Sequence, residues 1–428
     1  MEKPIGVSPK AEAILAKINQ DSQALRCQEP YARSNLLDAA RSLIAELETP
    51  GEMISRATWA EPALLATLKT AVDLKLFDEL IEDDGAPKSI RRLAEATGSE
   101  ELLIGRIIKH LVAMKIVEES GADSVAATKI SKALAIPKYR DGIVMMSDFL
   151  IMPCMKIPQY LARNGYRNPQ DATDCPFQSA QDTTKICFEY LAERPKLQEC
   201  FNNYMGGRRQ GERSWFDPDY FPVEDKLQHT ELNDSTPLLV DVGGGLGHDA
   251  EAFRKSYPDL PGRIIVQDLP RSVEQAAPVG RGIEMLSHDF FSPQPIHGES
   301  PQPRHPIPSH FLCQTATDNP LSLAGARFYF LHSVLHNWCD AQCRNILAQL
   351  VKVMESGSTV LINDFVVPDQ NPHWLMTSLD LIMMGMSAAT ERTGRQWGRL
   401  LGEVGLGIVR IWGHPDSTES LIEAELRR

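Results

Sequence analysis

A glycine-rich turn between two apolar segments constrains the fold of this chain more than any other feature. The mainly apolar segment 238–242 leads into glycines at 243, 244, 245 and 247, a helical pattern follows, and a second segment with an apolar centre, 263–267, leads to Asp268. This is the order of a nucleotide-binding β-α-β unit. Without a Cβ, glycine lets a ligand contact backbone N–H groups, and a carboxylate after the second strand can accept hydrogen bonds from both ribose hydroxyls. A glycine run alone is also compatible with a simple tight turn, but the complete unit predicts a cofactor that contains adenosine.

The composition is that of a globular protein large enough for two or three domains. The chain has 428 residues, of which 43% are hydrophobic and 24% are charged. The net charge of −13 argues against a nucleic-acid partner, because phosphate backbones are bound by clustered Lys and Arg side chains. The amino terminus does not resemble a signal peptide, and no stretch of about eighteen apolar residues occurs. We therefore expect a soluble cytoplasmic protein that does not engage a membrane.

The eight cysteines are scattered along the chain and contain no C-x-x-C pair. The closest pair, Cys339 and Cys343, is one helical turn apart. No group of His and Cys residues has the spacing of a zinc site. We expect reduced thiols and no bound metal.

Residues 1–140 are predicted to form a helical and winged-helix domain. Apolar residues recur at helical spacing over 36–47, so that this face requires a packing partner. The pattern then indicates a short helix ending at Gly98, a helix over 100–114 with Ser99 as its N-cap, and a two-stranded wing at 116–119 and 124–129. Winged helices bind DNA or mediate packing and dimerisation, and two glutamates at the start of the predicted recognition helix favour dimerisation.

Two further segments complete the predicted organisation. Residues 141–235 form a helical connector rich in Met and aromatic side chains, which suits either a core or a pocket for a flat apolar ligand. From 236 to 428, strands alternate with helices, which predicts an α/β, Rossmann-like domain with helices on both faces of its sheet and ligands at the carboxyl ends of the strands. The last two strands can form a hairpin, which makes one strand antiparallel. The seven expected strands are 238–242, 264–267, 283–286, 328–331, 360–363, 408–412 and 421–424.

Residues 292–325 interrupt this alternation. They are rich in Pro, Ser and His and have no periodicity. A loop of this length inside a compact domain is unusual, and we expect a disordered insertion.

Histidine and acidic residues gather at the ends of the later strands. An apolar strand leads to His332 and His336, Asp364 ends the next strand, and Glu391 lies in a Thr-Glu-Arg-Thr segment. The carboxyl ends of parallel strands lie on one side of a sheet, so these side chains are expected to meet there. A histidine beside carboxylates that fix its tautomer is arranged as a general base near neutral pH. A structural histidine is the alternative for either residue alone.

Taken together, these motifs resemble those of the class I S-adenosylmethionine-dependent O-methyltransferases of the plant caffeate and flavonoid type, in the branch that fungi use on secondary metabolites. The resemblance covers nearly the whole chain from about residue 30. It implies S-adenosylmethionine as cofactor, a winged-helix domain that forms a homodimer, and a small aromatic substrate. The motifs are 241–247, 268–270, 289–290, 336–338, Asp364 with 366–368, and 391–393.

The resemblance also implies residue roles. His336 corresponds to the catalytic base, and Asp364 and Glu391 to the acids that flank it. The base removes a proton from a phenol while the oxygen attacks the sulfonium methyl group, without a metal. The implied substrate-binding residues are Phe201, Met205, Ile382 and Met383. The implied cofactor-binding residues are Asp241, Gly243, Gly244, Gly245, Asp268, Leu269, Asp289, Phe290 and His332.

Three departures from the family pattern leave alternatives open. Asn337 follows the catalytic histidine where many relatives have Asp, Asp364 stands in place of Glu, and His332 stands in place of Lys or Arg. Some fungal relatives of this fold keep the cofactor but catalyse ring-forming or pericyclic reactions, which is the alternative function.

Two other functions come from single motifs. An NAD-dependent oxidoreductase is one alternative, because 245–250 also fits G-x-G-x-x-A. A winged-helix DNA-binding protein is the other.

Overall fold

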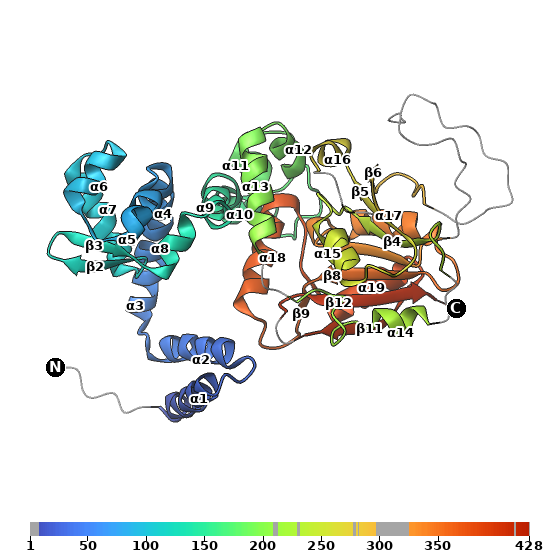
Figure 1. Ribbon diagram of the computed structural model, residues 1–428, viewed down its shortest axis with the longest axis horizontal. Helices are drawn as coiled ribbons and strands as arrows, with labels where there is room; N and C mark the ends of the chain where they lie inside the picture. Colours follow the sequence, from blue (N-terminus) through green and yellow to red (C-terminus); the bar gives the residue numbers. More distant parts are fainter. Residues whose placement is uncertain are drawn as a thin grey trace. The chain divides into compact units, whose positions relative to one another are not determined.

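The chain folds into two compact units, each formed from two stretches of sequence (Figure 1). The computed structural model describes residues 8–208, 213–228, 232–276, 280, 282–296, 325–414 and 417–427. Within these ranges, no helix has the length and hydropathy that a membrane span requires. The first unit comprises residues 1–151 and 191–211, and the second comprises 152–190 and 212–428. The predicted connector, 141–235, is therefore divided between the two units instead of forming a segment of its own.

Close packing of two helices places parts of that connector in the first unit. Helix α9 (Pro137–Met145) packs against α13 (Pro195–Arg208). A Cβ on Gly142 would lie 2.8 Å from Cδ2 of Tyr204, and a Cβ on Gly207 would lie 2.6 Å from Cβ of Lys138. Both distances are shorter than van der Waals contact. The two glycines therefore allow the helices to approach each other.

The amino-terminal helices of the first unit leave part of their apolar face exposed. Ser8 caps the first helix, which packs against the second. Leu37, Ile44 and Leu47 are 42%, 56% and 62% exposed. No described residue therefore covers much of the face that the sequence predicts to need a partner. These helices are α1 (Pro9–Arg26), α2 (Ala32–Leu47), α3 (Pro50–Ser55) and η1 (Arg56–Ala60).

The rest of the first unit contains the predicted winged helix, with one strand more than expected. The additional strand β1 pairs with β3, so the sheet has the order β1-β3-β2. Helix α6 ends at Gly98 (φ 65°), as predicted. The prediction for Ser99 is wrong: its N–H donates to Ala94 at 2.9 Å and closes the end of α6, and the N-cap of α7 is Glu100. The elements are α4 (Glu61–Asp73), α5 (Leu76–Gly85), β1 (Lys88–Ser89), α6 (Ile90–Thr97), α7 (Glu101–Ala113), β2 (Val117–Gly121), β3 (Ser124–Ala127), α8 (Lys129–Leu134) and η2 (Met146–Leu150).

The second unit contains a seven-stranded mixed sheet, which confirms the predicted fold class. Its spatial order is β11-β12-β8-β7-β4-β5-β6, and β12 is antiparallel to both of its neighbours while the other pairs are parallel. From β4 the chain continues to β5 on one side and later to β7 on the other. Ligands bind at such a reversal in open α/β sheets. The strands are β4 (Pro237–Val242), β5 (Arg263–Asp268), β6 (Ile283–Ser287), β7 (Phe328–His332), β8 (Thr359–Asp364), β11 (Leu406–Gly413) and β12 (Ser420–Leu426).

Apolar residues alternate along the strands, so both faces of the sheet form a core under helices. Val240 of β4 belongs to the core that includes residues of α17 (Asp340–Val351) and α19 (Gly394–Glu403). Leu239 belongs to the opposite core, with α14 (Val223–Leu227) and α15 (His248–Ser256). The other elements are α10 (Ile151–Arg163), α11 (Pro176–Gln181), α12 (Cys187–Ala192), α16 (Pro270–Gln275), η3 (Leu335–Asn337), β9 (Val366–Val367), α18 (Trp374–Ser387) and β10 (Arg392–Thr393).

Most of the predicted insertion, residues 297–324, lies outside the described residues. Its first five residues are described, and two of them, Gln294 and Ile296, are buried. Gln294 exchanges two buried hydrogen bonds with Gln267 of β5, at 2.6 and 2.9 Å. Ile296 is buried, and its carbonyl accepts the hydroxyl of Tyr329 at 3.2 Å. Residues 292–296 are therefore ordered by tertiary contacts, which the proline-rich composition does not reveal.

Candidate active site

The glycine turn lies at the carboxyl end of β4. The N–H groups of Gly243 and Gly244 donate to the carbonyl of Gln267 at 2.8 and 3.2 Å, which connects the turn to β5. Gly243 has a φ of 75°, and a Cβ there would lie 2.9 Å from Cγ2 of Val334. A Cβ on Gly244 would collide with the carboxylate of Asp241. Neither position has space for a side chain, as expected for a turn that brings the backbone close to a ligand.

Residues after β5 and β6 complete the cradle around this turn. Asp268 ends β5, and its Oδ2 accepts the N–H of Gly245 at 2.9 Å. Phe290 follows β6, and its Cε1 would lie 3.6 Å from a Cβ on Gly243. Each carboxylate oxygen of Asp268 keeps a further lone pair for a ribose hydroxyl. Leu269 and Asp289 adjoin these residues in sequence, so the predicted cofactor residues from β4 to β6 are at one edge of the sheet, and they fit a nucleoside.

His336 and Glu391 form a buried pair on the same unit. His336 lies on η3, the next element after β7, and Glu391 directly precedes β10. His336 donates its Nδ1–H to Oε1 of Glu391 at 2.8 Å, and the residues are 6% and 4% exposed. Burial lowers the pKa of His336, but the hydrogen bond and charge of Glu391, with Asp364 and Glu419 nearby, outweigh it and raise the pKa above the ordinary value. The predicted base therefore has an acid at hydrogen-bond distance.

Asp364 is the second acid beside this pair. Asp364 is the last residue of β8 and is 1% exposed. Burial raises the pKa of Asp364 to about 7, although the positive charge of His336 lowers it. Among the described residues, Oδ2 of Asp364 and Oε2 of Glu391 are buried and accept no hydrogen bond. Near neutral pH, Asp364 can therefore carry a proton or a negative charge.

His332 forms a separate cluster at the end of β7. Its Nδ1 donates to Oδ2 of Asp249 and its Nε2 donates to Oε2 of Glu419, both at 2.7 Å. Burial lowers the pKa of His332, but the two carboxylates outweigh this effect and raise it to about 10. Both ring nitrogens are thus hydrogen-bonded within the protein, and the cofactor contact implied for this residue stays a prediction. Glu419 also accepts the side-chain amide of Asn363 at 2.7 Å.

Sequence reasoning did not identify Asp249, Glu419, Asp380 or Arg392 as parts of this region. Asp249 lies in the first turn of α15, where an acid is a common feature of helix starts. Glu419 precedes the last strand and shares no motif with the others. Arg392 lies in the 391–393 motif, but the sequence analysis assigned it no role.

The predicted substrate-binding residues lie in different units. Ile382 and Met383 are on α18 in the second unit, and α18 packs against η3, which carries His336. Met383 is buried. Phe201 and Met205 are on α13 and belong to the first unit.

Comparison with known families decides the identity. The sequence matches the O-methyltransferase domain over residues 167–298 and 318–407 and the O-methyltransferase dimerisation domain over 63–136. The chain belongs to the O-methyltransferase family. Its cofactor is S-adenosylmethionine, and it is an S-adenosylmethionine-dependent O-methyltransferase. Residues 299–317, which the catalytic-domain match omits, fall inside the segment predicted as an insertion.

Similar proteins occur among fungal methyltransferases. The chain is 35% identical to the O-methyltransferase mfmE of Annulohypoxylon moriforme, over 91% of this chain and 89% of that protein. It is 31% identical to the demethylsterigmatocystin 6-O-methyltransferase of Aspergillus parasiticus, over 86% of each. Among solved structures, LepI in complex with SAM has a TM-score of 0.82 and 28% identity, and covers 97% of this chain and 100% of that one.

Proposed function

We propose that His336 is the general base of an O-methylation on a phenolic hydroxyl of a small, polyketide-like aromatic secondary metabolite. The observation that carries this proposal is the 2.8 Å hydrogen bond from Nδ1 of His336 to Glu391. In the neutral imidazole this bond keeps the proton on Nδ1 and leaves the lone pair on Nε2. A phenol has a pKa of about 10, so a base that accepts its proton increases the nucleophilicity of the oxygen.

Glu391 and Asp364 have distinct proposed roles. Glu391 holds the imidazole in one tautomer and stabilises the imidazolium that forms when Nε2 accepts the proton. Asp364 lies close enough to affect the pKa of His336 through its charge. Since its own pKa is raised to about 7, Asp364 can take up or release a proton as the charge on His336 changes.

The cofactor cradle orients the reacting carbon. S-adenosylmethionine, when bound, supplies a methyl group on a positively charged sulfur. Gly243, with Asp241, Gly244 and Gly245, would hold the methionine end, and Asp268 would bind the ribose. Leu269, Asp289 and Phe290 would contact the adenine end. Holding oxygen and methyl group in line lowers the entropic part of the barrier.

The acceptor would be planar and apolar. Ile382 and Met383 are proposed to line its pocket from α18, and the substrate contacts implied for Phe201 and Met205, on α13 of the first unit, stay predictions. Methionine side chains are flexible and polarizable, so they adapt to flat ligands. The name of the Aspergillus parasiticus relative, a demethylsterigmatocystin 6-O-methyltransferase, supports an aromatic secondary metabolite as the substrate class.

The proposed assembly is a homodimer in the cytoplasm, without a nucleic-acid or membrane partner. The match to a dimerisation domain over 63–136 supports the dimer. The described cysteines are free thiols, as expected in a reducing compartment.

Transfer of radiolabel tests the function. Wild type and H336Q are incubated with [methyl-14C]S-adenosylmethionine and orcinol, 1,3-dihydroxynaphthalene or emodin, phenols with one, two and three rings. We expect label in the product of at least one phenol with the wild type, and a loss of about 100-fold or more in H336Q. H110Q, on α7 of the first unit, is the control and should retain wild-type activity. Wild-type transfer by H336Q would overturn the assignment of the base.

A ring-forming or pericyclic reaction is the second candidate. One solved structure with a TM-score of 0.82 and 28% identity is described as a pericyclic reaction enzyme. Mass spectrometry of the products distinguishes the two functions. Methyl transfer adds one CH2 to the acceptor mass, whereas a pericyclic product keeps the substrate mass and contains no label.

A further inference from the structure

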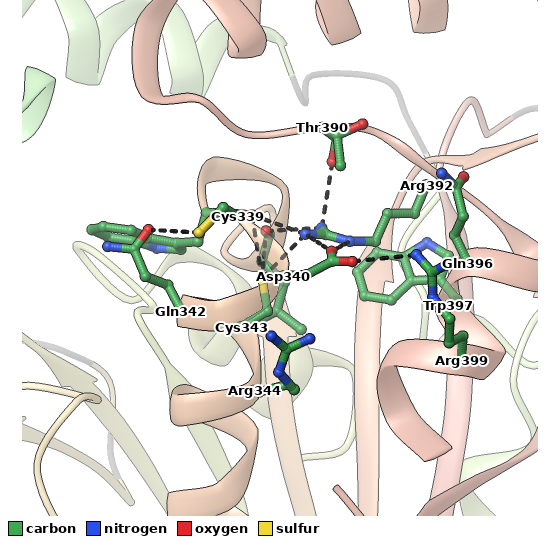
Figure 2. A network of polar contacts seen from close by, with 12 residues as sticks. Cys339, Asp340, Gln342, Cys343, Arg344, Thr390, Arg392, Gln396, Trp397 and Arg399 are labelled. Carbon is green, nitrogen blue, oxygen red and sulfur yellow. Dashed lines mark hydrogen bonds and ion pairs between the residues drawn. The ribbon is translucent and has the colours of Figure 1, made fainter. Parts of the chain in front are cut away.

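A buried arginine lies beside the His336–Glu391 pair. Arg392 is 1% exposed and directs its guanidinium between α17 and the segment at Thr390 (Figure 2). It forms an ion pair with Asp340, at 2.9 Å from both Nε and Nη2 to Oδ1. Its guanidinium carbon lies 5.1 Å from the ring centre of Trp397. A guanidinium stays charged in proteins, so these contacts compensate a permanent buried cation.

The remaining donors of Arg392 bind backbone on both sides of His336. Nη1 donates to the carbonyl of Leu335 at 3.1 Å, and Nη2 donates to the carbonyl of Trp338 at 2.9 Å. Leu335 directly precedes His336, and Trp338 follows it by two residues. The same two carbonyls accept the thiol of Cys343 at 3.2 and 3.3 Å. The short η3 helix is therefore held at both ends.

Arg392 also binds next to the acid. Nη1 lies 3.4 Å from the carbonyl of Thr390, the residue before Glu391 (Figure 2). Arg392 itself follows Glu391 in the chain. One side chain thus contacts the backbone around both members of the pair, although His336 and Glu391 are 55 residues apart.

We propose that Arg392 is a positioning residue that keeps His336 and Glu391 at hydrogen-bond distance from each other. It is required for proton removal but not for cofactor binding. The proposal rests on the role of His336 as base. Lysine cannot replace it fully, because a single ammonium lacks the planar fork that reaches two carbonyls and a carboxylate together. No contact of Arg392 given above involves the residues of the cofactor cradle.

Two variants and one control test this role. R392M keeps the length of the side chain without its donors, and R392K keeps the charge. R395M removes an arginine on α19 that pairs with Asp369 at the surface and is 83% exposed. For each we would measure binding of S-adenosylmethionine by calorimetry, kcat with the phenol that the wild type labels, and the pH titration of His336 by NMR of 13Cε1-labelled histidine, assigned with H336Q.

For R392M we expect a kcat about 100-fold below wild type, with the dissociation constant for S-adenosylmethionine within about 2-fold. The pKa of His336 should move down toward its ordinary value, because the bond to Glu391 loosens while Asp364 and Glu419 remain. R392K should lie between R392M and wild type, and R395M should match the wild type.

If Arg392 only stabilised the fold, its replacement would lower the unfolding temperature. It would not change kcat or the pKa of His336 in the folded, cofactor-bound protein. Folded R392M with wild-type kcat and an unchanged His336 titration would overturn the proposal. If R392M does not fold, R392K provides the test. A wild-type kcat together with a wild-type His336 titration in R392K would then overturn the proposal. If H336Q transfers methyl groups as the wild type does, the proposed function fails instead, and the His336 titration in the Arg392 variants still reports on positioning.

Discussion

The backbone N–H of Glu391 donates to Oδ1 of Asp380 at 2.8 Å, and this bond joins helix α18 to the acid that is hydrogen-bonded to His336. The hydroxyl of Thr390 donates to the same oxygen at 3.0 Å. Helix α18 also carries Ile382 and Met383, two of the proposed substrate residues. The position of Glu391 therefore depends on the same helix that is proposed to line the acceptor pocket.

Replacing Asp380 tests this connection. D380A leaves the N–H of Glu391 without its acceptor and should lower kcat about 10-fold, since the loss of such a bond is worth about 1–3 kcal/mol. D380N keeps an oxygen at the same place and should stay within about 3-fold of wild type. Steady-state kinetics at saturating S-adenosylmethionine provides the measurement. Equal losses in both variants would mean that charge, and not the hydrogen bond, is what matters.

The pH dependence of catalysis should follow the charge of Glu391. A base must be neutral, so kcat/KM should rise with pH through the pKa of His336, which Glu391 and the neighbouring acids raise. In E391Q the contribution of the Glu391 charge to the pKa of His336 disappears, while burial still lowers this pKa. The acid limb of the kcat/KM profile should therefore move to lower pH. The plateau should also fall about 100-fold, because the imidazolium is no longer stabilised.

The matched control is E403Q, which removes an exposed acid paired with Arg344. It should keep the wild-type profile. An unshifted acid limb in E391Q would show that His336 does not titrate in the measured step.

The stability of the protein should decrease in alkaline solution because of His332. Its pKa is about 10 in the folded chain and 6.5 when unperturbed. The folded state therefore keeps a proton that the unfolded state loses, and the contribution to stability is complete below pH 6.5 and lost as the pH rises through about 10. We expect the difference in unfolding temperature between wild type and H332Q to shrink from pH 6.5 to pH 9.5. A constant difference across this range would contradict a protonated His332 between Asp249 and Glu419.

The affinity for S-adenosylmethionine should depend on residue 243 being a glycine, which has no Cβ. G243A adds a Cβ that would lie 2.9 Å from Val334, at a φ of 75°. Strain of this kind costs about 1–3 kcal/mol, so the dissociation constant for S-adenosylmethionine should rise about 10-fold or more. G51A, where nothing lies within 4 Å of the added atom, is the control. Calorimetry that finds equal affinities for G243A and wild type would place the cofactor away from this turn.

The sequence by itself determined the elements of the catalytic unit. Strands β4 to β8, β11 and β12 follow from apolar runs, the turn at Gly243 from its glycines, and the antiparallel last pair from the short final segments, because these signals are local. The winged helix was equally evident, except that Ser99 serves the end of α6 and β1 adds a third strand. The motif residues at the strand ends also pointed to one edge of the sheet.

Only the tertiary structure decided which side chains meet there. His336 pairs with Glu391 and not with Asp364, His332 turns to Asp249 and Glu419, and Arg392 supports η3 from within the core. Each of these partnerships joins segments that are distant in sequence, and each depends on the rotamers and loop paths that packing selects. Spacing along a chain carries no information about that selection, whereas a buried charge must find its partner for the fold to be stable.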